Sequence, residues 1–320
     1  MQPMSKQPHQ PTINNENLAP IVLFVFARPD HTGTTLRALA ANHLASQSDL
    51  IVYSDAARNE TENIRVNEVR AIVRSTPGFR SIRLIERDSN YGLARNIIEG
   101  VTEVCVRHGR AIVMEDDLVT SPQFLTFMNL ALERYAGDPR VWHISGWNYP
   151  IDPSGLGDAF FLRVMNCWGW ATWADRWVHF EKDTDLLLTR FNKKMIRRFD
   201  LENSGAFWSQ VIGNNKGTIN TWAIYWYATI FLNNGLCLNP AQSFISNIGL
   251  DGSGTHGSRH HKEYATCSGP DHQVIFPEIV EEAPVAIDRI TAFYRQLQPS
   301  VARRVIRKAK SLLNVLQGSA

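Results

Sequence analysis

The sequence lacks the features that would assign it to several large classes of protein. Its 320 residues contain four cysteines, none in a Cys-x-x-Cys pair, so neither a zinc knuckle nor a redox motif is predicted. No run of about 18 apolar residues occurs, so no membrane span is predicted. Residues 1–19 are polar, which predicts a disordered tail without a secretory signal, and reduced cysteines fit a cytoplasmic protein. The formal net charge of +2 gives no reason to expect nucleic acid as a partner.

Two common nucleotide-binding motifs are also missing. A dinucleotide-binding Rossmann enzyme needs Gly-x-Gly-x-x-Gly after its first strand, but the turn from Ala27 to Gly33 reads Ala-Arg-Pro-Asp-His-Thr-Gly. No predicted strand is followed by Gly-Lys-Ser or Gly-Lys-Thr, which excludes a P-loop. Any nucleotide must therefore be bound by other means.

The sequence does contain a regular alternation of apolar runs and helical segments between residues 20 and 118. Strands are predicted at 21–26, 49–53, 81–85 and 111–114, and helices at 32–46, 60–74 and 91–108. This alternation predicts an α/β fold with a mostly parallel, Rossmann-like sheet flanked by helices. In such sheets the ligand lies beyond the carboxyl ends of the strands. Those ends carry Arg28, Asp55 and the acidic residues 115–117.

The chain changes character after about residue 119. All nine tryptophans lie beyond that point, and glycine and asparagine recur between residues 203 and 257. We expect residues 119–270 to form an irregular second half with aromatic loops, followed by a helical tail over residues 271–320. Within that tail, 301–316 has the pattern of a short basic amphipathic helix, which can lie on the surface of an anionic membrane. A helix that packs its apolar stripe on the domain and leaves its charges solvated is the alternative.

Three adjacent carboxylates, Glu115, Asp116 and Asp117, follow the fourth predicted strand. At the end of a buried strand they repel one another, and loss of water makes the repulsion worse. A hard divalent cation, Mn²⁺ or Mg²⁺, relieves the repulsion and can bridge to phosphate oxygens. It would also neutralise the charge that develops on a diphosphate leaving group. An ordinary solvated acidic turn is the competing interpretation, but the strand context favours a metal site.

The turn before the third predicted helix is a second candidate site. Ser89 or Asn90 can cap the helix, and Gly92 permits close approach of the backbone. Arg95 lies in the first turn, where it could reach a phosphate. A cap followed by a surface arginine explains the same pattern equally well.

Four segments together resemble the nucleotide-binding half of GT-A-fold glycosyltransferases. They are Phe26-Ala27-Arg28-Pro29, Tyr53-Ser54-Asp55, Asn90-Tyr91-Gly92 and Met114-Glu115-Asp116-Asp117-Leu118. The acidic segment is similar to the motif of the N-acetylglucosaminyltransferase I family and its bacterial relatives, and the resemblance spans about residues 20–260. It implies a GT-A fold in which residues 20–118 bind a nucleotide-sugar and residues 119–270 bind the acceptor.

The resemblance also implies a role for each matching residue. The residues of the nucleotide-sugar site would be Phe26, Arg28, Asp55, Asn90, Gly92, Arg95, Glu115 and Asp116. Among them, Asp55 would contact the uracil of a UDP-sugar, and Asp116 would face the ribose or the sugar. Asp117 would be the metal ligand, with His256 as a further ligand or a diphosphate contact. Trp168 and Trp170 could stack on a sugar, although buried aromatic residues are the commoner outcome.

Inversion at the anomeric carbon in one step requires a general base near the acceptor hydroxyl. The family resembled has acidic residues just before a tryptophan, but the matching stretch here, 219–222, reads Ile-Asn-Thr-Trp and has no carboxylate. The remaining candidates are Asp251, Asp175 and Glu202. Asp251 is preferred because the glycine-rich segment 249–256 holds a single acid, although a solvated Asp-Gly turn is an equal alternative.

The sequence thus predicts a metal-dependent, inverting hexosyl- or N-acetylhexosaminyl-transferase. Its donor would be a UDP-sugar and its acceptor a glycan or lipid-linked hydroxyl, as in polysaccharide biosynthesis. A nucleotidyltransferase that makes a nucleotide-sugar is one alternative, but the glycine-rich, basic first loop of such enzymes is absent. A non-enzymatic carbohydrate-binding protein would suit the aromatic loops, but not a metal-ready acidic cluster.

Overall fold

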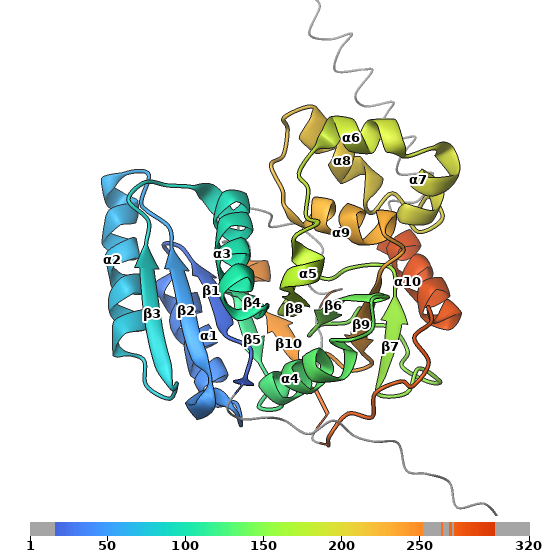
Figure 1. Cartoon of the computed structure of the whole chain (residues 1–320). Coiled ribbons are helices and arrows are strands. Elements are labelled where there is room, and N and C mark those ends of the chain that lie inside the picture. The colour runs from blue at the N-terminus through green and yellow to red at the C-terminus, as the bar shows by residue number, and fades with distance from the viewer. Residues whose placement is uncertain (1–16, 252–263, 265–268, 271, 298–320) are drawn as a thin grey trace, which may run out of the picture.

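The computed structural model describes residues 17–251, 264, 269–270 and 272–297. These residues form a mixed α/β domain in which helices flank an eight-stranded sheet, beside a two-stranded ribbon (Figure 1). The strands of the large sheet are β1 (Ile21–Val25), β2 (Asp49–Ser54), β3 (Ser81–Glu86), β4 (Arg110–Glu115), β6 (Val141–Ser145), β7 (Ala159–Leu162), β8 (Trp170–Trp173) and β9 (Leu236–Pro240). The ribbon pairs β5 (Leu118–Thr120) with β10 (Ile245–Asn247).

The α-helices lie between and after these strands. They are α1 (Pro29–Ala40), α2 (Glu60–Ser75), α3 (Gly92–His108), α4 (Phe124–Tyr135), α5 (Ala174–Trp177), α6 (Thr184–Arg190), α7 (Lys193–Phe199), α8 (Trp208–Asn215), α9 (Ala223–Leu232) and α10 (Pro284–Leu297). Two short 3₁₀ turns are η2 (Ala45–Gln47) and η3 (Gly249–Asp251).

Every strand and helix predicted for residues 20–118, hereafter the first half, is present, and the predicted fold class is confirmed. The clearest difference is α1, which begins at Pro29 and ends at Ala40 instead of covering 32–46. Proline is favoured in the first turn of a helix because it has no N–H group to leave unpaired. The strands β1, β2 and β4 are continuous apolar runs because helices cover both faces of the sheet.

The strand order places a topological switch point between β1 and β4. The large sheet has the order β3-β2-β1-β4-β8-β6-β9-β7, and the first four strands are parallel. The chain moves outward from β1 to β3 and then returns to β4, so right-handed crossovers put α1 and α2 on one face and α3 on the other (Figure 1). Ligands of open α/β sheets bind in the crevice at such a reversal.

Residues 119–270, hereafter the second half, continue the same sheet with mixed pairing. Strand β8 runs antiparallel to β4, with Trp170 beside Val113 and Trp173 beside Arg110. Strand β6 is antiparallel to β8, so β6 runs parallel to β4 and ends at the same edge. Nearly every residue of α9 is buried beneath the group formed by α6, α7 and α8 (Figure 1).

The predicted helical tail is partly integrated into the domain. Helix α10 buries Ala286, Ile287 and Ile290, and its Tyr294 hydroxyl donates to the Tyr149 hydroxyl at 2.9 Å. The described part of residues 271–297 therefore packs against the second half. The predicted amphipathic helix 301–316 lies outside the described residues. Across the described ranges, no helix combines the length and the apolar character needed to cross a membrane.

Candidate active site

The acidic cluster, Glu115, Asp116 and Asp117, lies at the carboxyl end of β4, at the switch point. Glu115 is level with Phe24 of β1, so the ends of the two strands are aligned. Burial, with the charges of Asp117 and Asp116, raises the pKa of Glu115 to about 8. Burial also raises the pKa of Asp116 to about 6, although the Arg28 charge acts against it. The three carboxyl groups are more than one arginine can neutralise, and a divalent cation would supply the missing positive charge.

Arg28 is the cation that contacts this cluster in the structure. Its Nη2 pairs with Asp116 and lies 3.0 Å from Oδ2 of Asp117. Asp116 is held from the other side as well, because its Oδ2 accepts from the backbone N–H of Phe26 at 3.0 Å. The other terminal nitrogen, Nη1 of Arg28, is buried without a hydrogen-bond partner in the described part of the chain. Arg28 therefore joins the predicted nucleotide residues to the acidic cluster and keeps one donor available for an anion.

The residues that could hold a divalent cation are few. Over the described ranges, no three His, Cys, Asp or Glu side chains converge as a ready-made metal site. A Mn²⁺ or Mg²⁺ ion bound with a nucleotide needs only one or two carboxylates, because phosphates and water complete its shell. Asp117, with a side chain 15% exposed, fits that donor set. The second predicted ligand, His256, lies outside the described residues.

The predicted contacts around Asp55 form a joint between β2 and α3. The Asp55 carboxylate accepts from the backbone N–H groups of Tyr91 at 2.8 Å and Gly92 at 2.9 Å. Asn90 donates its side-chain amide to the Ala56 carbonyl at 2.6 Å. Gly92 has a φ of +71°, in the left-handed region that glycine adopts without strain. Both Asp55 oxygens thus already accept backbone hydrogen bonds.

Arg95 is exposed and contacts residues at the start of its own helix. Its side chain is 58% exposed, its Nε donates to Glu99 at 2.6 Å, and its guanidinium lies over the Tyr91 ring at 3.7 Å from the centroid. These contacts match the surface-arginine interpretation of the helix start.

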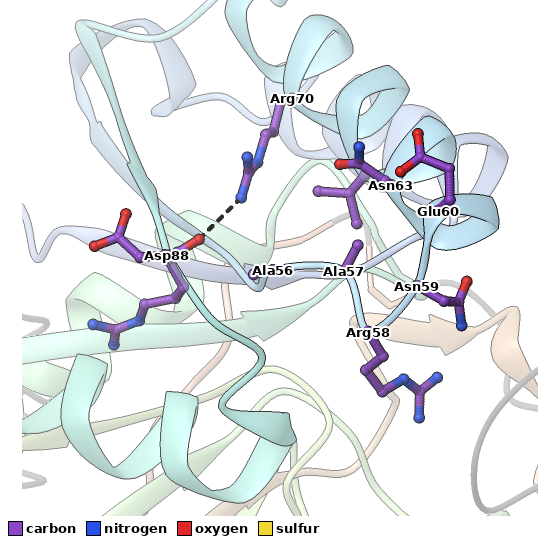
Figure 2. Close-up of a pocket in the computed structure, with 10 residues that line it drawn as sticks. Ala56, Ala57, Arg58, Asn59, Glu60, Asn63, Arg70 and Asp88 are labelled. Atoms are coloured by element: carbon purple, nitrogen blue, oxygen red, sulfur yellow. Dashed lines mark hydrogen bonds between the residues drawn. The ribbon is translucent and has the colours of Figure 1, made fainter.

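A polar cavity of about 500 Å³ lies where β2 and β3 end, beside the start of α2 (Figure 2). Sequence reasoning missed it, because its arginines come from three separate segments: Arg58, Arg70 and Arg87. The guanidinium of Arg58 lies 5.4 Å from the centre of the Phe26 ring, which connects the cavity to the end of β1. The guanidinium of Arg87 lies over Tyr53, and its Nη2 is buried without a hydrogen bond to any described residue. The lining of the cavity carries charges of both signs, since Glu60 and Asp88 lie beside the three arginines.

Of the three candidate bases, Asp251 alone is shown beside the acidic cluster. Ile248 donates its N–H to the Asp117 carbonyl at 2.9 Å, and Gly249 packs so closely that an added Cβ would lie 2.1 Å from Oδ2 of Asp117. Asp251 follows in the same short turn, η3. Its carboxylate Oδ2 lies 3.2 Å from Nε2 of His31.

Neither of the other two candidates is shown in contact with the acidic cluster among the described residues. Asp175 follows β8, whose Trp173 is level with Arg110 at the start of β4, so it lies at the opposite edge of the sheet from Glu115. The length of β4 puts that edge roughly 17 Å from the cluster, which removes Asp175 as a base at this site. Glu202 has a φ of +55° in the loop between α7 and α8 and pairs with Arg197.

The two tryptophans singled out from the sequence have different environments. Trp170 is 1% exposed and stacks on Trp222, with ring centroids 5.3 Å apart, so it belongs to the core. Trp168 is partly buried and contacts Trp147 edge-on at 4.7 Å. It comes just before β8, level with the end of β4, and the neighbouring Cys167 has its pKa raised to about 12 by burial and by the Glu115 charge. Only Trp168 is thus near the acidic edge.

No family profile and no curated protein matches the sequence. Among solved structures, the chain is similar to a mannosyltransferase from Pyrobaculum calidifontis in complex with GDP-mannose and Mn²⁺. The identity is 10%, the TM-score is 0.39, and the match covers 67% of this chain and 69% of that one. A mycobacterial protein matches with 13% identity and a TM-score of 0.32, over 52% of this chain and 58% of its own. Matches this distant leave the function to be argued from the site.

Proposed function

We propose that this protein is a metal-dependent glycosyltransferase that moves a sugar from a nucleotide-diphospho-sugar to an acceptor hydroxyl. One observation carries the proposal: a cluster of carboxyl groups with a raised pKa at Glu115, and the arginine that contacts the cluster, lie at the switch point of the sheet, and a polar cavity lies at the ends of β2 and β3. Positive and negative groups at a sheet reversal suit a ligand that brings both phosphate and metal.

The order of the strands suggests how the donor would lie. The acidic cluster ends β4, Arg28 follows β1, and the cavity lies at the ends of β2 and β3. Strands are about 4.8 Å apart, so the cavity is roughly 10–14 Å from the cluster, about the length of a nucleoside diphosphate. The nucleoside would occupy the cavity, the diphosphate would lie over Arg28 and Asp117, and the sugar would face Trp168.

The proposed reaction is a single displacement with inversion. The acceptor oxygen forms a bond to the anomeric carbon while the bond from that carbon to the diphosphate oxygen breaks. Asp251, beside the cluster, would take the acceptor proton, and Arg28 would stabilise the charge left on the diphosphate. A divalent cation held by Asp117 would supply further charge neutralisation when bound.

The narrower specificity rests on the sequence resemblance. It suggests a UDP-sugar, a hexosyl or N-acetylhexosaminyl group, and a glycan or lipid-linked acceptor in polysaccharide biosynthesis. Contact of 301–316 with an anionic membrane would place the enzyme near a lipid-linked acceptor. The GDP-mannose bound by the Pyrobaculum enzyme makes GDP the first alternative nucleotide to test.

The two alternative functions account less well for this site. A nucleotidyltransferase usually carries a glycine-rich, basic first loop, but the segment from Ala27 to Gly33 is not of that kind. A carbohydrate-binding protein would need exposed aromatic faces, but most of the tryptophans, Trp170 and Trp226 among them, are buried in the core.

Calorimetric titration of UDP and GDP with and without Mn²⁺ tests the proposal. We expect one nucleotide to bind only with Mn²⁺, and Asp117→Asn to weaken that binding by at least about a hundredfold, since even indirect metal contacts are worth ten- to a hundredfold. Asp175→Asn makes the same charge change at the opposite edge of the sheet and should leave binding unchanged. Wild-type Mn²⁺-dependent affinity in Asp117→Asn would contradict the metal assignment.

A further inference from the structure

His31 makes a contact at the site that the sequence pattern did not indicate. It lies in the first turn of α1, and its Nε2 is 3.2 Å from Oδ2 of Asp251, which lies far along the chain in η3. The imidazole side chain is 17% exposed, whereas that of Asp251 is 50% exposed. A mostly buried imidazole therefore contacts one oxygen of a half-exposed carboxylate.

The turn that carries Asp251 is held in place without His31. Strands β5 and β10 pair Asn247 with Leu118, the residue after the acidic cluster. Ile248 donates its N–H to the Asp117 carbonyl at 2.9 Å, and Gly249 donates its N–H to the Asn247 side chain at 2.8 Å. The imidazole therefore adds a side-chain contact to a turn whose backbone is already held by other groups.

The first turn of α1 is a rigid support for the imidazole. Thr32 donates its hydroxyl to the Arg28 carbonyl at 2.8 Å, and Thr35 donates its hydroxyl to the Asp116 carbonyl at 2.9 Å. The helix is thereby fixed to the same acidic cluster that the η3 turn touches. His31 and Asp251 meet because both of their supports are attached to this cluster.

We propose that His31 is a positioning residue for Asp251, an inference that rests on the proposed function. The Nε2–H group donates to Oδ2 and fixes the carboxylate so that Oδ1 faces the acceptor hydroxyl. The acceptor proton passes to Oδ1 as the new glycosidic bond forms and the bond to the diphosphate breaks, and His31 keeps its own proton. A base oriented by a third group in this way reacts faster, because fewer of its conformations are unproductive.

The test measures release of nucleoside diphosphate from UDP-glucose, UDP-N-acetylglucosamine and GDP-mannose with Mn²⁺, with water as the acceptor. Asp251→Asn should lower kcat by about a hundredfold or more, the usual contribution of a general base. His31→Phe should lower kcat about tenfold and leave the KM for the donor unchanged. His31→Gln, whose amide N–H can replace Nε2–H, should recover most of the rate. His108→Phe, at the exposed end of α3, is the matched control.

The double variant His31→Phe/Asp251→Asn separates a positioning role from a structural one. If His31 acts only through Asp251, the double variant has the kcat of Asp251→Asn alone, whereas independent effects would multiply. His31→Asn, whose amide is too short to reach Asp251, repeats the comparison with a polar side chain if the phenylalanine variant does not fold.

Multiplying losses, a wild-type kcat in both His31→Phe and His31→Asn, or no recovery in His31→Gln would overturn the positioning role while donor binding measured by calorimetry stayed normal. A wild-type protein that bound none of the three nucleotide-sugars would instead overturn the proposed function, and this inference with it.

Discussion

The two halves of the protein share one sheet but are held together by different contacts. In the first half, charged groups gather at the strand ends, where Arg28 meets Asp116 and Arg70 meets Glu86 at 2.9 Å. In the second half, the interior is aromatic, and rings such as Trp177 and Trp226 pack with centroids 4.9 Å apart. The first half thus has its charged side chains at the strand ends, and the second half contributes an aromatic core.

Buried titratable groups show the same contrast. Burial keeps His143 neutral by lowering its pKa to about 3, and its ring nitrogens are both used: Nδ1 accepts from the Trp226 indole N–H at 3.2 Å, and Nε2 lies 3.0 Å from the Asn166 carbonyl. Burial likewise favours the neutral form of Glu115 in the first half, but there the charges of Asp117 and Asp116 add to the rise in its pKa. The hydrogen-bonded histidine stabilises the core of the second half, whereas the carboxyl beside two further carboxyls points to a ligand.

The largest expected effect is on the aromatic core of the second half. Trp226 is fully buried, and Trp226→Ala would leave a cavity and an unpaired His143 nitrogen, which costs about 3–5 kcal/mol in the free energy of unfolding. Urea denaturation measures this loss. The control Val178→Ala, at a side chain that is 74% exposed, should stay within about 0.5 kcal/mol of wild type. A loss in Trp226→Ala no larger than in the control would mean that the aromatic cluster does not hold this half together.

The next effect concerns the joint between β2 and α3 in the first half. Asp55→Ala removes the acceptor for the half-buried N–H groups of Tyr91 and Gly92, and each of these hydrogen bonds contributes about 0.5–1.5 kcal/mol. Thermal melts of Asp55→Ala and Asp55→Asn check this, because the asparagine keeps one acceptor oxygen and should lose less. Binding of UDP, GDP and CDP should weaken together. A selective loss of UDP binding in a folded variant would instead establish that Asp55 reads the base.

Much of the first half could be predicted because its signals are local in the sequence. Continuous apolar runs gave β1, β2 and β4, and the rule that ligands bind at carboxyl strand ends led to the acidic cluster and Arg28. The pairing of Arg28 with Asp116 and Asp117 was not predicted, since adjacent strand ends come from residues far apart in the chain.

The second half was harder to predict, because the positions of its residues depend on how its antiparallel strands pair. Asp175 stood as a candidate behind the preferred Asp251 in the sequence, and only the pairing of β8 with β4 shows that it lies at the opposite edge of the sheet from Glu115. His31 was overlooked because the turn η3, which carries its partner Asp251, is brought to α1 only by the pairing of β5 with β10 just before it. The cavity of Figure 2 was missed for a similar reason, since its arginines converge only in the folded chain.

The smallest expected effect tests whether the ionised form of Glu115 destabilises the protein when no cation is bound. Its pKa in the folded protein, about 8, is above the ordinary value of 4.5, so its contribution to stability is fully present below pH 4.5 and is lost as the pH rises through 8. Glu115→Gln, which cannot ionise, should therefore melt at nearly the wild-type temperature at pH 5 and a few degrees higher at pH 8.5, with EDTA in both buffers. His143 titrates equally in both proteins and cancels from the comparison.

Adding Mn²⁺ to the comparison of wild type with Glu115→Gln tests whether a cation binds beside Glu115. If a divalent cation binds at the acidic cluster, it stabilises the ionised carboxylates, so replacing EDTA by Mn²⁺ at pH 8.5 should raise the melting temperature of wild type more than that of Glu115→Gln. If wild type and Glu115→Gln differ in melting temperature by the same amount at pH 5 and pH 8.5, the pKa of Glu115 is not raised. If Mn²⁺ raises both melting temperatures equally, the cation lies away from Glu115, because the negative charge of Glu115 then does not strengthen its binding.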